Sequence, residues 1–409
     1  MIHIDGKGFP PDIRIQKEAD ALTSQGFEVY VLTLKSNQTQ PAFEQLCPNL
    51  FTRRIDRVSP FLLSKLLSKF TLITPSYCQE IVDFVSDYRL RALHVHDFKF
   101  VPTVLMAARR FNIPVIADLH ENMPAALRAY RSGSPPAEKL KRYVLDNDRI
   151  WRYHERRYLP QCDRVIVVVP EAVERLSSYG IPESKVKIVS NTEDESTFEF
   201  DPADFNKEII EKYASQWVVS YIGGIGPHRG IDTVLAGVPL ARSEIENFRL
   251  VIVGATGNQK QALERVAAKL GIEDSVEIIG WQPFDKVNSY VLASQVCLVP
   301  HNDFEHTQTT VPHKLFQYMI CGKPVLVSDC RPLARIVGDT DAGYIFRAND
   351  ATDFARRLTH IHRHPEQAHA KGQSGRLAAL GPYAWRHDAA RLVEMYTDLF
   401  DLKREVLRV

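Results

Sequence analysis

Residues 309–324 read TTVPHKLFQYMICGKP, and this stretch carries the start and stop signals of one complete short helix. Pro312 suits the first helical position, Gly322 the left-handed residue just past the end, and Pro324 the stop. The apolar residues recur at i, i+1, i+4 and i+5 and predict one buried face, made of Leu315, Phe316, Met319 and Ile320. The opposite stripe carries His313, Lys314, Gln317 and Cys321.

Lys314 stands at an unfavourable position in this predicted helix. The positive end of the helix dipole opposes a cation in the first turn by a few tenths of a kcal/mol. An anion held by the backbone N–H groups would reverse that cost, because the dipole, the amides and Lys314 would then act together. The alternative is that Lys314 points into water. The pattern alone leaves both interpretations open.

The chain has 409 residues, which is too long for one ordinary hydrophobic core, so we expect two domains. Its 44% hydrophobic and 25% charged residues are ordinary globular values. The net charge of +1 argues against a protein that binds nucleic acid through bulk electrostatics.

The cysteines indicate a reducing compartment, because all six are scattered and none forms a CxxC pair. The first residues lead straight into structure without a signal peptide, and no apolar run reaches the roughly 18 residues that span a bilayer. We therefore expect a cytoplasmic protein. Residues 59–74 (SPFLLSKLLSKFTLIT) predict an amphipathic helix, which we favour as a cover for a sheet. The alternative is peripheral contact with the inner face of a membrane.

Short β-branched runs alternate with helical stretches along the whole chain, which is typical of buried parallel sheets. A helix over residues 17–25 ends at Gly26 and leads into the strand at Val29, as in a βαβ unit. We predict an α/β fold with two doubly wound Rossmann-like domains facing a central cleft, where loops that follow strands bind ligands. The predicted strands are 29–32, 92–95, 114–117, 164–168, 187–189, 217–222, 249–253, 276–279, 296–299 and 324–327.

The domain boundary is predicted after Asn191. Residues 192–216 are acidic and are interpreted as a linker, and Trp217 opens a new strand. We expect an N-terminal domain over 1–191 and a C-terminal domain over 217–384. The last helical stretch, 385–409, can pack on either domain, including by crossing back to the N-terminal one.

A glycine-rich loop, GGIGPHRGID (223–232), follows the predicted strand 217–222. Glycines let backbone amides approach an anion closely, and Arg229 adds a planar cation suited to phosphate. The loop is neither a dinucleotide fingerprint, since Arg229 replaces its third glycine, nor a Walker loop. The alternative is a tight turn between a strand and a helix.

His120 lies in DLHE (118–121), directly after the predicted strand 114–117. The carboxyl end of a parallel strand is where a catalytic or substrate-orienting histidine belongs. The alternative is a packed, hydrogen-bonded histidine. His94 and His96 lie in another strand, but their spacing supports no ligand set with His120, so we expect no metal site.

Residues 6–14 (GKGFPPDIR) share a feature with residues 309–324, a cation in the first turn of a predicted helix. Asp12 can cap a helix, and Arg14 would lie in its positive first turn, close to Gly8. The segment therefore predicts a second place that faces an anion or a substrate. The alternative is a surface ion pair between Asp12 and Arg14.

Together these motifs resemble the retaining nucleotide-sugar glycosyltransferases of the GT-B fold, and more closely family 4 (glycosyl transferases group 1). The resemblance runs over nearly the whole chain. Five motifs match in order: residues 11–19 the opening helix, 118–121 the "DxHE" loop, 190–194 the domain-ending "PNxxD", 223–232 "GRxxxxKG", and 314–324 "KLFEYMxxGKP".

The resemblance also marks departures at single positions. Where the family pairs an arginine and a lysine against the diphosphate, this chain has Gly224 and Arg229. The two glutamates that the family places eight residues apart fall on Thr309 and Gln317. Gln317 can still accept a ribose hydroxyl through its amide oxygen. The glutamate at the position of Thr309 usually touches the donor sugar.

The resemblance implies that a sugar is transferred from a nucleotide-diphosphate sugar to an acceptor hydroxyl, with retention of its anomeric configuration. The acceptor would be a glycan or polysaccharide precursor, either a glycan or a lipid-linked molecule. The transfer would need no bound metal or other cofactor. The diphosphate would rest on the amides of the 312–321 helix, with Arg229 and Lys314 as cations. His120 would orient the donor sugar or stabilise positive charge near its anomeric carbon. Further donor contacts are expected at Gly223, Gly224, Trp281, Gln282, Thr309, Thr310, Val311, His313, Leu315 and Gln317, and acceptor or diphosphate contacts of the N-terminal domain at Gly8, Asp12 and Arg14.

Two other functions on the same fold stay open at this point. One is a nucleotide-sugar epimerase, which releases the sugar onto no acceptor. The other is a non-catalytic nucleotide-sugar-binding or scaffold protein that has lost the family's glutamates. A nicotinamide dehydrogenase is disfavoured by the broken glycine fingerprint at Arg229.

Overall fold

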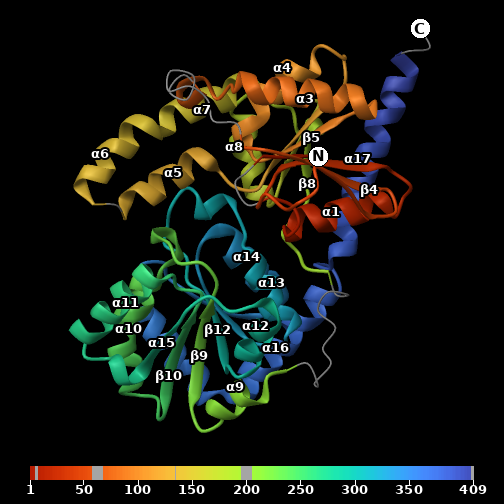
Figure 1. Cartoon of the computed structure of the whole chain (residues 1–409). Coiled ribbons are helices and arrows are strands. Elements are labelled where there is room, and N and C mark those ends of the chain that lie inside the picture. Colours follow the sequence, from red (N-terminus) through yellow and green to blue (C-terminus); the bar gives the residue numbers. More distant parts are fainter. Residues whose placement is uncertain (5–7, 58–67, 134, 195–204, 407–409) are drawn as a thin grey trace. The chain divides into compact units, whose positions relative to one another are not determined.

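The computed structural model of the chain describes residues 1–4, 8–57, 68–133, 135–194 and 205–406. The chain forms two compact units, one made of Met1–Ser190 with Arg386–Val409 and the other of Asn191–Trp385 (Figure 1). Each unit is built on a sheet with parallel pairing and surrounding helices. The predicted α/β class with two Rossmann-like units is confirmed.

The sheet of the first unit has the strand order β3-β4-β2-β1-β5-β6-β7-β8, and only the β3–β4 pair is antiparallel. Its strands are β1 Ile2–His3, β2 Val29–Leu34, β3 Phe43–Cys47, β4 Leu50–Ile55, β5 Leu93–His96, β6 Val115–Leu119, β7 Arg164–Val167 and β8 Val186–Ile188. Its helices are α1 Ile13–Thr23, α3 Pro75–Tyr88, α4 Val101–Ala108, α5 Met123–Ser132, α6 Pro136–Leu145, α7 Asp148–Tyr158 and α8 Val173–Ser177, followed at the end of the chain by α17 Trp385–Val406.

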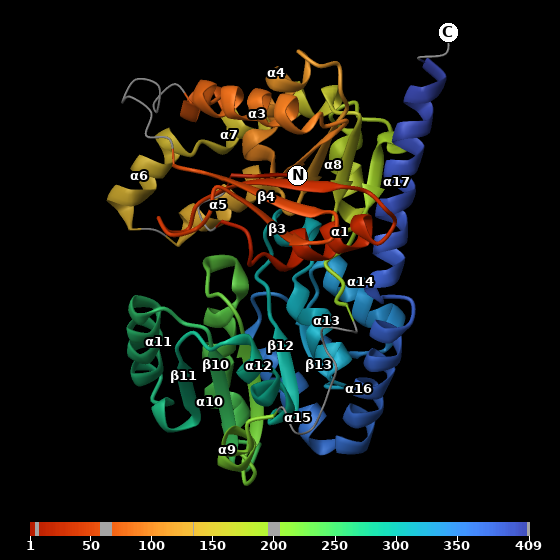
Figure 2. The ribbon, with the colours of Figure 1, turned by 45° about the vertical axis from the view of Figure 1, so that its right-hand side comes forward.

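The sheet of the second unit is parallel throughout, with the order β11-β10-β9-β12-β13-β14 (Figure 2). Its strands are β9 Trp217–Ile222, β10 Phe248–Val253, β11 Val276–Ile279, β12 Val296–Val299, β13 Val325–Ser328 and β14 Gly343–Phe346. Its helices are α9 Lys207–Lys212, α10 Ile231–Arg242, α11 Gly257–Lys269, α12 Phe284–Leu292, α13 His313–Ile320, α14 Arg331–Thr340, α15 Ala351–Arg363 and α16 Pro365–Leu380. Helix α9 lies in the range that the sequence predicted as a linker.

Alternating side chains of the central strand β9 place helices on both of its faces. Val219 and Tyr221 point into a core shared with α10 and α15. On the other face, the hydroxyl of Tyr318 on α13 accepts a hydrogen bond from the Ile222 N–H at 3.0 Å. Because side chains alternate along a strand, one short segment can support two layers of helices. Helix α13 is thereby fixed to the carboxyl end of β9.

Helix α13 is the helix predicted over residues 312–321, with a one-residue difference at each end. Pro312 is the N-cap rather than the first helical residue, and Gly322 has the expected left-handed φ of +66°. The four residues of the predicted apolar face are all buried. Helix α1, by contrast, begins four residues earlier than predicted, and Asp12 caps it as expected by accepting a hydrogen bond from the Ile15 N–H.

Most of the predicted amphipathic helix over residues 59–74 lies outside the described residues. In the described remainder, residues 68–71 are helical and Leu72 is buried. None of the described helices combines the length and the apolar character needed to cross a bilayer.

Helix α16 packs closely on the turn that ends α13, and we predict that this contact depends on Gly372. A Cβ at Gly372 would lie 2.2 Å from the Gly322 carbonyl oxygen, whereas a Cβ at Gly338 on α14 would meet nothing within 4 Å. Gly372→Ala should lower the free energy of unfolding by about 1–3 kcal/mol, as overpacking does. The matched control Gly338→Ala should leave it unchanged or raise it by about 0.5–1 kcal/mol. Urea unfolding measures both, and equal effects would contradict the packing argument.

Candidate functional site

Gly223 follows β9 and leaves room for a lysine. Its φ is +127°, which favours glycine, and a Cβ at this position would lie only 2.6 Å from the Nζ of Lys314. The neighbouring Gly224 is exposed, and its carbonyl accepts a hydrogen bond from the Tyr221 hydroxyl at 2.6 Å. The glycine loop therefore lies beside the side chain of Lys314.

The side chain of Lys314 is buried and its ammonium has no hydrogen-bond partner among the described residues. The residue is 9% exposed, and Nζ lies 3.7 Å from the centre of the Tyr221 ring. Burial, reinforced by the nearby charge of Arg229, lowers the pKa of Lys314 well below its ordinary value. The interpretation in which Lys314 points into water is therefore wrong.

Arg229 lies at the end of a short 3-10 turn, η7 Pro227–Arg229, and is held by a histidine. Its Nη1 donates to Nε2 of His301, which follows β12, at 3.0 Å. Since an arginine can only donate, Nε2 of His301 is an unprotonated acceptor. Burial and the charge of Arg229 hold the pKa of His301 well below its usual range. Next to Arg229, Gly230 has φ +69° and approaches the Pro300 carbonyl so closely that no side chain fits.

The histidines near Arg229 and Lys314 are uncharged. Burial and the charge of Arg229 lower the pKa of His228 to about 2 and that of His306 to about 3, so both rings are neutral at physiological pH. In the described part of the chain neither Arg229 nor Lys314 forms an ion pair with a carboxylate. The charge of Arg229 and the amine of Lys314 are thus left without an ion-pair partner among the residues that the structure describes, which is the electrostatic condition for binding an anion.

The other predicted donor contacts differ in accessibility. Thr309, Thr310, Val311 and Leu315 are buried. The Thr309 hydroxyl donates to the Glu305 carbonyl oxygen at 3.1 Å, and the N–H of Leu315 is bonded to the Pro312 carbonyl, so Leu315 offers a ligand neither its side chain nor its amide. Trp281 is 77% exposed, and Gln282 is half-buried. His313 and Gln317 are partly exposed and lie on one side of α13.

A second charged cluster lies in the first unit, centred on Asp118 at the end of β6. Arg14 binds Asp118 through two hydrogen bonds, from Nε at 2.9 Å and from Nη2 at 2.8 Å, and its Nη2 lies 3.0 Å from Glu18. Arg14 is only 4% exposed, so the alternative of a surface pair with Asp12 is wrong. The sequence also predicted that the charge of Arg14 faces a ligand. The structure differs, because that charge is paired with buried carboxylates. Burial opposes ionisation, but Arg14 and His120 hold the pKa of Asp118 well below its usual range.

His120 is the accessible member of this cluster. Its side chain is 23% exposed, and its Nε2 donates to Asp118 at 2.9 Å while Nδ1 lies 3.6 Å from Asp97. Burial disfavours the imidazolium, but the two carboxylates outweigh it and raise the pKa of His120 to about 9. A protonated ring is a hydrogen-bond donor and does not stabilise positive charge near an anomeric carbon. Of the two predicted roles, orientation of a sugar hydroxyl fits this charge state.

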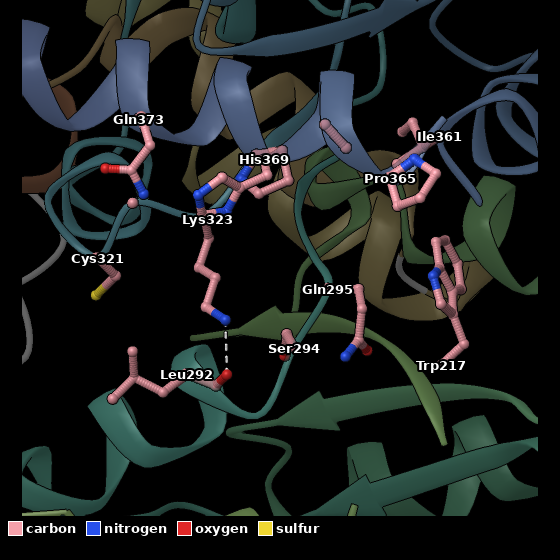
Figure 3. A pocket seen from close by; sticks show the side chains of 13 residues that line it. Trp217, Leu292, Ser294, Gln295, Cys321, Lys323, Ile361, Pro365, His369 and Gln373 are labelled. Atoms are coloured by element: carbon pink, nitrogen blue, oxygen red, sulfur yellow. Dashed lines mark hydrogen bonds between the residues drawn. The ribbon is translucent and has the colours of Figure 1, made fainter. Parts of the chain in front are cut away.

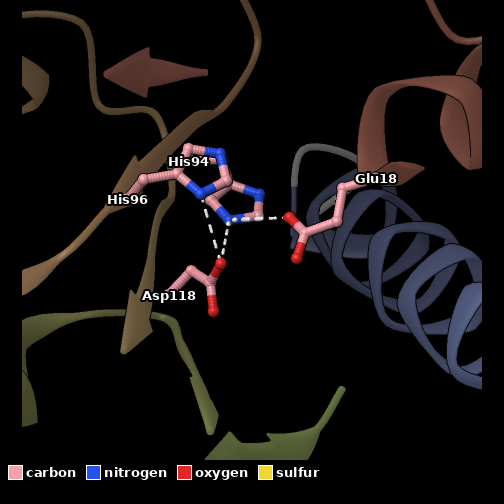
Figure 4. A group of neighbouring side chains, drawn as sticks. All are labelled: Glu18, His94, His96 and Asp118. Atoms are coloured by element: carbon pink, nitrogen blue, oxygen red, sulfur yellow. Dashed lines mark ion pairs between the residues drawn. The ribbon is translucent and has the colours of Figure 1, made fainter. Parts of the chain in front are cut away.

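Four buried side chains of the cluster have the spacing of metal ligands: Glu18, His94, His96 and Asp118 (Figure 4). Their ligand atoms lie within 4.8 Å of one another. Asp118, however, already accepts three hydrogen bonds from Arg14 and His120, and Glu18 is paired with Arg14. Nδ1 of His94 is bonded to the Tyr396 hydroxyl at 2.8 Å. We assign no metal to this cluster, because the cation Arg14 already occupies the carboxylates.

Gly8 precedes α1 and approaches the end of β2. It has φ +74°, and a Cβ there would lie 2.9 Å from the Leu34 carbonyl oxygen. Asp12 is committed to capping α1. Both residues therefore have structural roles that explain their presence, and their predicted contact with a substrate stays a prediction.

A pocket of about 370 Å³ lies near the amino ends of the strands of the second sheet (Figure 3). This is the opposite end of the strands from the Arg229–Lys314 region. Trp217, Gln295 and Lys323 line it, and Nζ of Lys323 donates to the Leu292 carbonyl oxygen at 2.7 Å. None of the predicted site residues lines this pocket. Its one lysine is satisfied by the protein, so the pocket lacks the electrostatic character of the Arg229–Lys314 region.

Sequence analysis missed the partners that hold the charged groups. His301 follows the predicted strand 296–299, so the signal that singled out His120, a histidine directly after a strand, was present there too. Glu18 and Tyr221 carry no such signal, because a residue inside a helix or a strand gives no sign of which distant residue it contacts. Glu193 lies in the 190–194 motif, but motif spacing cannot show that it contacts α13.

Comparison with known proteins gives two family models that together span most of the chain. The model described as Glycosyltransferase Family 4 matches residues 14–196, and the model described as Glycosyl transferases group 1 matches residues 202–378. The division between the two models falls close to the division between the two units of the structure.

Full-length relatives and solved structures agree with these models. The D-inositol 3-phosphate glycosyltransferase of Streptosporangium roseum is 22% identical, over 94% of this chain and 87% of its own. Sucrose-phosphate synthase from Thermosynechococcus elongatus superimposes with a TM-score of 0.76 at 19% identity, over 98% of both chains. Anabaena HepE in complex with UDP-glucose gives a TM-score of 0.71 at 13% identity, over 97% of this chain and 98% of its own.

The raised pKa of His120 predicts a pH-dependent contribution to stability. Because the folded pKa is about 9 and the ordinary pKa about 6.5, the contribution is full below pH 6.5 and is lost as the pH rises to about 9. The free energy of unfolding of the wild type should exceed that of His120→Gln by on the order of 2–3 kcal/mol at pH 6 and by almost nothing at pH 9.5. Urea unfolding at both pH values measures the difference. A gain that is the same at both values would contradict the assigned charge state.

Proposed function

Because the chain belongs to glycosyltransferase family 4 and has the GT-B fold, we propose that it transfers a sugar from a nucleotide-diphosphate sugar to an acceptor hydroxyl, with retention of anomeric configuration. The observation that carries the choice of donor is the buried ammonium of Lys314 beside Arg229, which no carboxylate neutralises in the described part of the chain. Two neighbouring cations suit the two phosphates of such a donor. The acceptor is proposed to be a glycan or lipid-linked precursor.

In this proposal the diphosphate lies in front of α13. The N–H of Lys314 is in the first turn of that helix and has no intrahelical acceptor, so the backbone adds a donor to the two side-chain cations. As the bond to the sugar breaks, negative charge grows on the leaving phosphate. Preorganised donors stabilise that charge more than they stabilise the ground state, and the rate rises accordingly. Side-chain cations, rather than a bound metal, balance the charge.

His120 is proposed to donate a hydrogen bond to a hydroxyl of the sugar. Its protonated ring is supported by Asp118 and Asp97, and Arg14 in turn supports Asp118. The first unit is proposed to bind the acceptor. An epimerase on the same fold would release its sugar in the absence of any acceptor, so product analysis with donor alone distinguishes that activity from transfer.

The test of the donor site is Arg229→Ala. Loss of one charged contact to the leaving phosphate should reduce kcat by about 10²–10³. The matched control is Arg356→Ala, since Arg356 is an exposed arginine of the same unit that pairs only with Asp353 in the described contacts. Turnover is measured with the tightest-binding member of a panel of nucleotide sugars. Undiminished turnover of Arg229→Ala, or equal losses in both variants, would remove Arg229 from the reaction.

We also propose peripheral contact with an anionic membrane through α6 in the first unit. Three large apolar side chains spaced at i, i+3 and i+4 are exposed there: Leu140 at 69%, Tyr143 at 48% and Val144 at 51%. At 100° per residue, Lys139 and Lys141 flank this stripe on its two sides. An apolar stripe bordered by lysines is typical of helices that lie in a membrane interface, and the charges match anionic head groups.

Flotation with vesicles tests this contact. Lys139→Gln combined with Lys141→Gln should weaken binding to phosphatidylglycerol vesicles by about tenfold or more, and added salt should do the same. Leu140→Ser should weaken binding to a similar degree, whereas Leu377→Ser, at a leucine that is 74% exposed in the second unit, should have no effect. Binding that is insensitive to all of these changes would exclude α6 as the contact.

A further inference from the structure

The carboxylate of Glu193 lies against the exposed side of α13. Glu193 is 2% exposed, and its Oε1 accepts a hydrogen bond from Nε2 of Gln317 at 3.0 Å. Nδ1 of His313, one turn earlier on the same helix, lies 3.1 Å from the same oxygen. The segment that carries Glu193 is itself fastened to this region, because Asn191 donates to the Val311 carbonyl oxygen at 2.8 Å. A buried carboxylate thus lies beside the position where the family has a glutamate and this chain has Gln317.

A carboxylate can only accept hydrogen bonds, and this fixes the orientation of the amide that it contacts. Gln317 must turn its NH₂ group toward Glu193, which leaves Oε1 as the end available to a ligand. No other hydrogen bond involves the Gln317 side chain among the described residues. The amide is therefore presented as an acceptor, although a glutamine that lacked such a neighbour could present either end.

We propose that Glu193 is a positioning residue that holds Gln317 as a neutral acceptor for ligand hydroxyls, namely the ribose diol of the nucleotide donor. This inference rests on the proposed function and assigns to Glu193 a role in selecting ribonucleotide donors. The carboxylate stays in the protein, one residue removed from the ligand, and the group that meets the ligand carries no charge.

The arrangement explains why a glutamate at position 317 would not suit this chain. Gln317→Glu would place two carboxylates about as far apart as Nε2 and Oε1 are now, and like charges at that distance cannot both ionise without cost. Exchanging the two residues, Glu193→Gln with Gln317→Glu, would keep one donor and one carboxylate. The pair is therefore coupled, and a double-mutant cycle can measure that coupling.

The experiment measures discrimination between ribose and a sugar without hydroxyls. Binding of ADP, GDP, CDP and UDP, of their 2′,3′-dideoxy forms, and of inorganic pyrophosphate is measured by calorimetry, and the tightest ribonucleotide is compared with its dideoxy form. The wild type should prefer the ribonucleotide by about tenfold. In Glu193→Gln and in Gln317→Glu the preference should fall to about twofold or less, with pyrophosphate affinity unchanged. The exchanged double variant should recover most of the preference.

The controls separate this inference from the proposed function. Glu244→Gln, at an exposed glutamate of the same unit that pairs with Arg363, should leave the preference unchanged. Arg229→Ala should weaken the binding of the ribonucleotide, of its dideoxy form and of pyrophosphate to the same degree. A wild type that binds pyrophosphate without a ribose preference, or a Glu193→Gln protein that keeps its preference, overturns the role of Glu193 and leaves the diphosphate site standing. A wild type that binds neither nucleotides nor pyrophosphate overturns both.

Discussion

The proposed chemistry of this protein depends on a buried ammonium that the protein does not neutralise. Taking a charged amine out of water costs several kcal/mol. The contact between Lys314 and the Tyr221 ring returns about 0.5–2 kcal/mol, which is too little to offset that cost. The pKa of Lys314 is lowered for the same reason, because the cost of burying the charged amine exceeds what its contacts return. The proposed diphosphate in front of α13 would offset this cost. Gly223 must be a glycine, because any side chain there would displace the ammonium.

In the first unit, by contrast, the buried charges are paired with charges of opposite sign. There Arg14 is surrounded by Asp118 and Glu18, and His120 is supported by two carboxylates. A compensated cluster of this kind holds its members in place without attracting a ligand, since breaking one buried pair typically costs about 3–5 kcal/mol. His120 is the exception within the cluster because it keeps a partly exposed surface. In the proposed function, this contrast assigns binding of the charged donor to the second unit and orientation of the sugar to the first.

Much of the fold could be predicted from the sequence, because the strands that were predicted are continuous apolar runs. Strands β1, β3, β4 and β14 were missed. β3 and β4 carry charged or polar residues, β1 has only two residues, and β14 begins at a glycine, a residue that is depleted in strands. Helix α13 was predicted almost to the residue, since its ends are marked by proline and glycine. Motif spacing singled out Arg229 and Lys314, but not what holds them, because His301 reaches Arg229 and Tyr221 reaches Lys314 from distant positions in the chain.

The partners that hold the proposed donor-binding groups share a property that motif spacing cannot reveal. His301 fixes Arg229 through one hydrogen bond and stays neutral, because burial and Arg229 itself prevent its protonation. A carboxylate at position 301 would hold the arginine as firmly, but it would cancel the positive charge that a diphosphate requires. On the partly exposed side of α13, the Gln317 amide would separate the carboxylate of Glu193 from the proposed ligand. In both places the group that is proposed to meet the ligand keeps its own charge and hydrogen-bonding capacity. The group that supports Arg229 is uncharged, and the carboxylate that supports Gln317 is kept one residue away from the proposed ligand.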